Sequence, residues 1–138
     1  MVDLNGEHGL HLDPVAVAYS KRQWFMEHLD ELELIEEVVA FARKWYGKVP
    51  LAVATGGTRL VAEKTIFEVG LSDLFDEVVT SDDITAGKPA PDVYLEAARR
   101  LGMDPEKCLA VEDAPAGIMA AQSAGMKVVV VPETLQVH

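Results

Sequence analysis

Two short segments of the sequence combine residue types that could hold a phosphate group. Thr55-Gly56-Gly57 offers a hydroxyl and two small residues, so backbone N–H groups could approach a phosphate closely. Lys88 lies between Gly87 and Pro89, and a lysine held in this way can act as a point charge against phosphate. Each segment also has an ordinary interpretation, the first as a strand-to-helix turn and the second as a solvated surface lysine.

A third segment, Glu112-Asp113, places two carboxylates directly after the apolar run Leu109–Val111. Two adjacent negative charges are unfavourable unless a cation or solvent compensates them, and carboxylate oxygens are ligands that suit Mg²⁺. Alternatively, Asp113 is the N-cap of a helix that begins at Pro115. Both interpretations can hold together, but capping does not account for Glu112.

The elements that must position these residues alternate between strands and helices. Short apolar runs predict buried strands at 51–54, 77–80, 109–111 and 127–131. Capping residues and glycines predict helices at 14–29, 34–46, 58–70, 91–102 and 115–124. This alternation is typical of an α/β fold, in which helices flank a parallel sheet.

The carboxyl ends of parallel strands form one edge of such a sheet, where ligands bind. That edge would collect Thr55-Gly56-Gly57, Ser81-Asp82-Asp83 and Glu112-Asp113. The helix at 34–46 is expected to bury an apolar face formed by Ile35, Val38, Val39, Phe41, Ala42 and Trp45.

Composition narrows the classes of partner. The 138 residues include 12 basic and 23 acidic ones, and this net charge of −11 argues against nucleic acid and anionic membranes as partners. A hydrophobic content of 49% indicates a folded domain. The single cysteine, Cys108, excludes an internal disulfide framework. No apolar run is long enough to span a bilayer and no signal peptide is recognisable, so a cytoplasmic location is expected.

The order and spacing of three runs carry a resemblance to a known family. The chain resembles the haloacid dehalogenase-like (HAD) hydrolase superfamily in three runs that follow in order: Leu51–Gly57, 87–94, and Val111–Gly117, the last followed by 124–126. Within it, the chain is similar to the branch of β-phosphoglucomutases and small sugar-phosphate phosphatases. The resemblance extends from Asp13 to Pro132, and it implies a Rossmann-like sheet flanked by helices.

The resemblance also implies a role for each candidate residue. Thr55, with Gly56 and Gly57, matches the phosphate-binding motif, and Lys88 matches the lysine that balances the charge of nucleophile and phosphate. Glu112 and Asp113 match the acidic pair that holds Mg²⁺. Residues 1–30 would be an N-terminal remnant of the helical cap, and residues 31–138 the HAD-like core.

The sequence departs from the family at one motif. Members begin with an apolar strand that ends in Asp-x-Asp-Gly-Thr, whose first aspartate attacks phosphorus, and this sequence has no such strand. Asp3-Leu4-Asn5-Gly6-Glu7 is faintly similar, but only two residues precede it. In the family the strand lies centrally, between the strands expected at 51–54 and 109–111. These two strands must pair with each other, accept another segment, or be completed by a second chain.

Two functions are compatible with these residues. The first is a Mg²⁺-dependent phosphoester hydrolase that acts on a phosphorylated small molecule, with metal-activated water, Asp82 or Asp83 replacing the usual nucleophile. The second is an inactive remnant that binds phosphate or metal, or serves as an interaction module. In either case we expect a homodimer or higher homo-oligomer, because the central strand is missing and the apolar helix at 14–29 has lost most of its cap partners.

Overall fold

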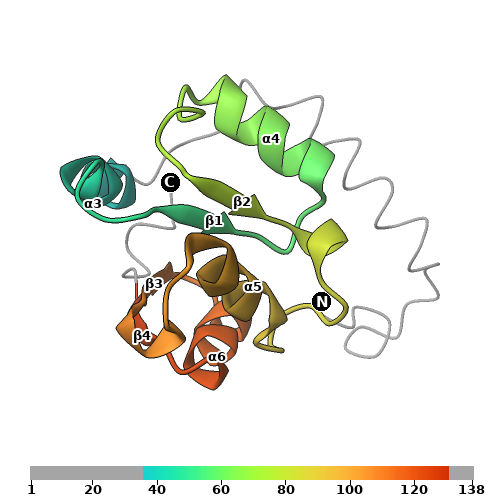
Figure 1. Ribbon diagram of the computed structural model, residues 1–138. Coiled ribbons are helices and arrows are strands. Elements are labelled where there is room, and N and C mark those ends of the chain that lie inside the picture. The colour runs from blue at the N-terminus through green and yellow to red at the C-terminus, as the bar shows by residue number, and fades with distance from the viewer. Residues whose placement is uncertain (1–35, 131–138) are drawn as a thin grey trace. The chain divides into compact units, whose positions relative to one another are not determined.

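A computed structural model of the chain describes residues 36–130, with side chains from Val38 onward (Figure 1). The helix predicted at 14–29 lies outside these residues. The predicted division between residues 1–30 and 31–138 falls outside them too and stays a prediction.

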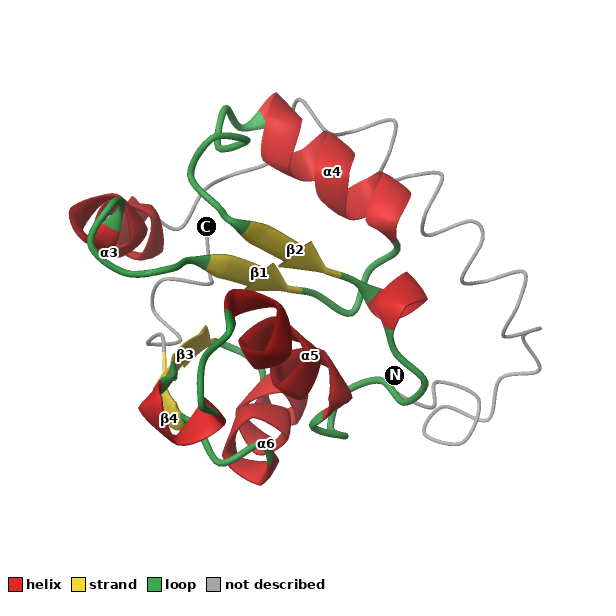
Figure 2. Cartoon of the chain, viewed as in Figure 1, coloured by secondary structure: helices red, strands yellow, loops and turns green. Residues whose placement is uncertain are grey.

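The described strands form two parallel pairs (Figure 2). β1 (Ala52–Ala54) pairs with β2 (Glu77–Val79), with Ala52 opposite Glu77. β3 (Leu109–Glu112) pairs with β4 (Lys127–Val130), with Leu109 opposite Lys127. The α/β class with parallel strands, predicted from the alternating pattern, is therefore confirmed, and all four strands lie where the apolar runs placed them.

Within the described residues the α-helices are α3 (Glu36–Trp45), α4 (Arg59–Glu68), α5 (Asp92–Leu101) and α6 (Pro115–Ser123). Local chemistry explains several of their ends. The hydroxyl of Thr58 caps α4, and α5 stops at Gly102, whose φ of 67° is the left-handed conformation that glycine adopts easily. The alternative interpretation of Asp113 as the cap of α6 is wrong: the N-cap is Ala114, and no side chain caps this helix. None of the described helices is long and apolar enough to cross a membrane.

One buried core connects the two strand pairs. α5 contacts β1, β2 and α6, while α6 contacts β3 and β4, so the two helices link one pair of strands to the other (Figure 1). The core is built largely of small side chains, which allow helices and strands to approach closely. Its buried members are Val79, Val93, Tyr94, Ala97, Ala110, Ala120, Ala121 and Ala124.

No strand among residues 36–130 joins β1 to β3, and the two pairs are separate sheets. The family's central strand lies between these two, so this is the place where the sequence predicted that β1 and β3 pair with each other, accept another segment or are completed by a second chain. Of the three ways of closing the gap, direct pairing of β1 with β3 is absent from the described residues. The site described below lies at the carboxyl ends of these two strands.

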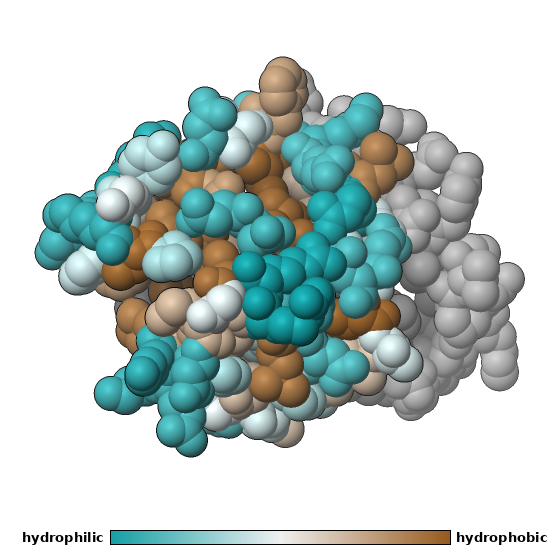
Figure 3. All heavy atoms as spheres, in the orientation of Figure 1, coloured by the Kyte–Doolittle hydropathy of each residue, from teal (hydrophilic) through white to brown (hydrophobic). Residues whose placement is uncertain are grey.

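Several large apolar side chains remain at the surface (Figure 3). On α3, Phe41 and Trp45 are 41% and 37% exposed, so the expectation that both are buried is wrong. Their rings pack on each other, with centroids 6.4 Å apart. The 3.6-residue period predicted the helix correctly, but period alone does not show that a neighbouring element covers its apolar face.

Candidate active site

The ammonium of Lys88 connects the two strand pairs. Its Nζ donates to the carbonyl oxygen of Ala54, at the end of β1, over 3.3 Å. It also donates to Oε1 of Glu112, at the end of β3, over 2.6 Å. The Lys88 and Glu112 side chains are only 19% and 8% exposed, so solvent screens this ion pair little. The structure thus brings together the lysine and one of the two carboxylates predicted from the sequence.

Tyr94 of α5 completes the surroundings of Glu112. Its hydroxyl donates to Oε1 of Glu112, the oxygen that also accepts from Lys88. The Lys88 ammonium lies 5.1 Å from the centroid of the Tyr94 ring, within the range of a cation–π interaction. Burial, reinforced by the hydrogen bond to Glu112, raises the pKa of Tyr94, so this hydroxyl keeps its proton and acts as a donor.

Glu112 is ionised despite its burial. Burial by itself would raise the pKa of this carboxyl, but hydrogen bonds from Lys88 and Tyr94 outweigh it and hold the pKa below its usual value. Gly117 of α6 provides the room for this carboxylate, because a Cβ at Gly117 would overlap the carboxylate atoms of Glu112. The Glu112 carboxylate is therefore held beside Lys88 and against α6 at Gly117, where there is no space for a second side chain.

The segment Thr55–Gly57 follows β1 directly. The Thr55 N–H continues the strand by donating to Val79 over 3.0 Å, and the Thr55 hydroxyl oxygen accepts from the Gly57 N–H over 3.1 Å. Gly56 is exposed, and a Cβ placed there would meet nothing within 4 Å. Thr55 is the neighbour of Ala54, whose carbonyl binds Lys88, so the predicted phosphate-binding residues and the lysine meet at one edge.

Asp113 is the exposed carboxylate of the acidic pair. Its charge contributes to the raised pKa of Tyr94, which places it in the electrostatic environment of the same cluster. Residues 38–130 contain no group of three or more His, Cys, Asp or Glu side chains that could hold a metal ion. Two adjacent carboxylates still fit Mg²⁺, which binds to one or two carboxylates and completes its shell with water and substrate phosphate.

Asp83 has a structural environment that sequence reasoning did not foresee. It lies in a 3-10 turn, Ser81–Asp83, and accepts from the Thr80 N–H and from the side chains of Arg59 and Arg100. The hydrogen bond from the Thr80 backbone is the largest cause of its lowered pKa, and both arginines add to it. A carboxylate occupied by these donors is a poor nucleophile, which argues against the nucleophilic role considered for Asp83.

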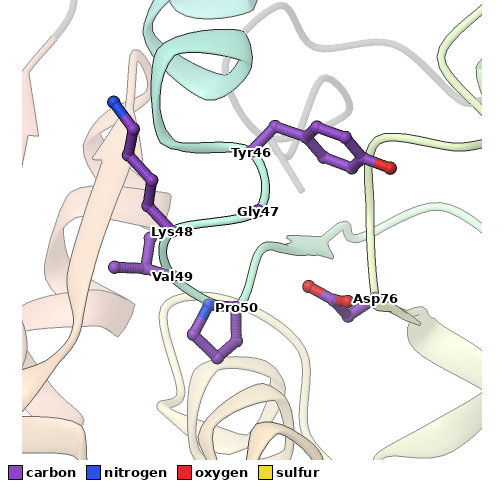
Figure 4. A pocket seen from close by; sticks show the side chains of 6 residues that line it. All are labelled: Tyr46, Gly47, Lys48, Val49, Pro50 and Asp76. Carbon is purple, nitrogen blue, oxygen red and sulfur yellow. The ribbon is translucent and has the colours of Figure 1, made fainter.

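Sequence reasoning also missed Tyr94, Gly117, Arg59 and Arg100. Each is an ordinary helix residue in the sequence, and only folding places it beside a carboxylate. An open surface hollow lies elsewhere, at the amino end of β1 (Figure 4). It is lined by Tyr46, Gly47, Lys48, Val49, Pro50 and Asp76. The predicted site residues lie at the opposite end of β1, so this hollow is not part of the candidate site.

Comparison with known proteins identifies the family. The profile of the haloacid dehalogenase-like hydrolases matches residues 3–125, nearly the whole chain. Fructose-1-phosphate phosphatase YqaB of Escherichia coli (strain K12) is 40% identical over 122 residues, which cover 86% of this chain and 63% of that protein. The chain belongs to the haloacid dehalogenase-like hydrolase family, as its motifs predicted.

Solved structures agree with this assignment. CbbY of Rhodobacter sphaeroides, crystallised with phosphate, superposes with a TM-score of 0.70 at 30% identity over 88% of this chain and 57% of its own. β-Phosphoglucomutase of Clostridium difficile gives a TM-score of 0.71 at 28% identity, over 88% and 56% of the two chains. These neighbours confirm the predicted resemblance to the branch of β-phosphoglucomutases and small sugar-phosphate phosphatases. The chain spans less than two thirds of the length of each of these three relatives.

The space at Gly117 gives a first prediction. Gly117→Ala should lower the free energy of unfolding by about 1–3 kcal/mol, because the new Cβ displaces the Glu112 carboxylate from Lys88 and Tyr94. Gly56→Ala is the matched control and should cost much less, since nothing lies near its Cβ. Urea unfolding measures both, and equal costs would contradict the proposed close packing.

The ion pair gives a second prediction, on stability and pH. Lys88→Met should lower the free energy of unfolding by about 3 kcal/mol near pH 7, because it leaves Glu112 charged and buried. The double variant Lys88→Met/Glu112→Gln should recover part of this loss.

The loss should also shrink with acidification. Because folding lowers the pKa of Glu112, the stability that this carboxylate contributes is present above its unfolded pKa and disappears as pH falls through the folded pKa. Urea unfolding at neutral pH and at about pH 3.5 measures the difference between parent and Lys88→Met. A difference that does not change with pH would show that the ion pair is not its source.

Proposed function

We propose that the chain binds a phosphorylated small molecule at the edge formed by Thr55, Lys88 and Glu112-Asp113, and hydrolyses its phosphoester with Mg²⁺. The single observation that carries this proposal is the position of Lys88 Nζ between Ala54 and Glu112. An ammonium has three N–H donors. Two are used in these hydrogen bonds, so one is left for a phosphate oxygen beside Thr55.

The phosphate-binding loop supplies a further donor and room for the phosphate. The Thr55 hydroxyl oxygen already accepts from Gly57, so its hydrogen is free to donate to a phosphate oxygen. The open space at Gly56 lets a phosphate approach the backbone closely. α4 begins just after this loop, and its N-terminus favours negative charge.

Asp113 and the second oxygen of Glu112 are the groups that would hold Mg²⁺, since Oε1 of Glu112 already accepts from Lys88 and Tyr94. When bound, Mg²⁺ would supply positive charge against the phosphate oxygens. This cation matters in a chain of net charge −11, which would otherwise repel an anionic substrate.

We favour water as the attacking group over the two described carboxylates considered for this role, Asp82 and Asp83. Its oxygen bonds to phosphorus, the bond from phosphorus to the ester oxygen breaks, and the alcohol leaves with a proton. Asp83 is engaged by two arginines, and Asp82 accepts from the backbone N–H of Arg59 over 2.9 Å, so neither carboxylate is directed at a phosphate in this arrangement. Positioning and electrostatics supply most of the catalysis in phosphoryl transfer.

The relatives support this chemistry. YqaB of Escherichia coli is named as a phosphatase that acts on fructose 1-phosphate, and the CbbY structure holds phosphate. We therefore propose a phosphorylated sugar as the substrate class. Nucleic acid is not proposed as a partner, because the 23 acidic residues outnumber the 12 basic ones. A cytoplasmic location stays a prediction.

Activity provides the third prediction. Phosphate release from a panel of sugar phosphates, measured with Mg²⁺, should fall at least about 100-fold in Lys88→Ala and in Asp113→Asn. Lys107→Ala, which removes an exposed lysine outside the site, is the matched control and should keep the parent rate. Parent activity that persists in both site variants would contradict the mechanism. Phosphate or Mg²⁺ binding by calorimetry without any turnover would favour the inactive binding module instead.

Self-association provides the fourth prediction. We propose a homodimer or higher homo-oligomer, because no described strand joins β1 to β3 and the aromatic side chains of α3 are exposed. Light scattering at micromolar concentration should give at least twice the 15.0 kDa mass of the chain. A mass of one chain would refute the proposal.

A further inference from the structure

Asp83 is the meeting point of three elements. Both the N–H and the hydroxyl of Thr80, which follows β2 and is fully buried, donate to Oδ2 of Asp83, over 2.8 and 3.0 Å. Arg59, the first residue of α4, donates to the same oxygen over 2.6 Å. Arg100 of α5 approaches the other oxygen to within 3.1 Å. One carboxylate therefore connects the end of β2, the start of α4 and the last turn of α5.

The two arginines are themselves fixed by the same strand. Arg59 donates a second hydrogen bond to the Val78 carbonyl over 2.9 Å, and Arg100 approaches this carbonyl to within 3.5 Å. Both guanidinium groups are therefore held by β2 as well as by Asp83. A charge-assisted network of this kind, with a 15% exposed carboxylate at its centre, restricts movement more than a single surface ion pair does.

This network reaches the phosphate-binding loop by two further contacts. The Ser81 N–H donates to the Gly57 carbonyl over 3.0 Å, and the Arg59 N–H donates to Asp82 over 2.9 Å. Arg59 directly follows Thr58, the cap of α4. The turn that contains Asp83 thus holds the segment Thr55–Gly57 from one side.

The same turn also begins the segment that leads to Lys88. Asp83 ends the 3-10 turn, and the chain runs from there to Lys88 in five residues. Because this short segment starts at Asp83, a shift of Asp83 would move the lysine and the phosphate-binding loop relative to each other. A displacement of about 1 Å can cost a reaction about 100-fold.

We propose that Asp83 is a positioning residue that sets the phosphate-binding loop Thr55–Gly57 against Lys88, through its ion pairs with Arg59 and Arg100. It does not touch the phosphate itself. This inference rests on the proposed function, because it assigns Asp83 a role in the site where phosphate would bind.

The fifth prediction tests this role with Asp83→Asn. Asparagine keeps an acceptor for the Thr80 N–H but loses the charge that holds both arginines. Binding of inorganic phosphate, measured by calorimetry on the full chain, should weaken about 10-fold or more. Hydrogen exchange should rise at the amides of Arg59 and Ser81, which bond to Asp82 and Gly57, while β3 and β4 keep their protection.

Glu63→Gln is the matched control. Glu63 accepts from the other nitrogen of Arg59 over 3.2 Å and is 60% exposed, so this variant removes a negative charge from the same guanidinium without touching Asp83. It should bind phosphate as the parent does. Arg59→Lys is a second variant that keeps the charge and loses the two-pronged contact to Asp83 and Val78, and it should weaken binding to an intermediate degree.

The outcomes separate the two proposals. Circular dichroism first confirms that each variant is folded. If Asp83 had a merely structural role, its substitution would lower the free energy of unfolding and leave the phosphate affinity of the folded variant unchanged. Parental affinity in folded Asp83→Asn, or in folded Arg59→Lys if the first variant does not fold, overturns the positioning role and leaves the proposed function intact. A parent chain that binds no inorganic phosphate overturns the proposed function and this inference with it.

Discussion

The described part of the chain depends on one largely buried ammonium, that of Lys88. The two strand pairs share no backbone ladder, and Lys88 bonds to the last residue of β1 and the last residue of β3. Helix packing holds the pairs together from one side, and this lysine joins them at the edge where ligands bind in parallel sheets. In the proposed function, the charge that joins the two strand pairs is also the charge that binds phosphate. Stability and the proposed phosphate binding therefore draw on one group.

Much of the fold could be read from the sequence because its signals are local. Short apolar runs gave the strands, and residues such as Thr58 and Gly102 mark helix ends by their own chemistry. Thr55 and Glu112 were predicted because the carboxyl ends of parallel strands meet at one edge, and Lys88 because it lies between Gly87 and Pro89 in a run that resembles the family's lysine motif. The alternative interpretation of Asp113 as a helix cap was wrong because Ala114, which directly precedes the first helical residue Pro115, occupies the N-cap position. The exposure of Phe41 was missed because it depends on what packs beside α3.

The supporting residues could not be predicted because they act across distances in the chain. Tyr94 reaches Glu112 across 18 positions, and Arg59 reaches Asp83 across 24. Nothing in the type or local spacing of these residues distinguishes them from other helix side chains. Their partners are acidic residues whose burial is itself a result of folding. Polar residues at strand ends thus indicate where chemistry can occur, whereas the groups that fix their geometry become visible only in three dimensions.

The contact between Gly117 and Glu112 has a consequence for sequence evolution. The carboxylate occupies the volume into which a side chain at position 117 would grow. The two positions are therefore not free to vary independently: a larger residue at 117 becomes acceptable only where the acid at 112 is shortened, as in aspartate. A shortened acid would in turn draw away from Lys88 and Tyr94. Four positions from two separate stretches of the chain, 88–94 and 112–117, are thus expected to change together, because a substitution at one limits those allowed at the others.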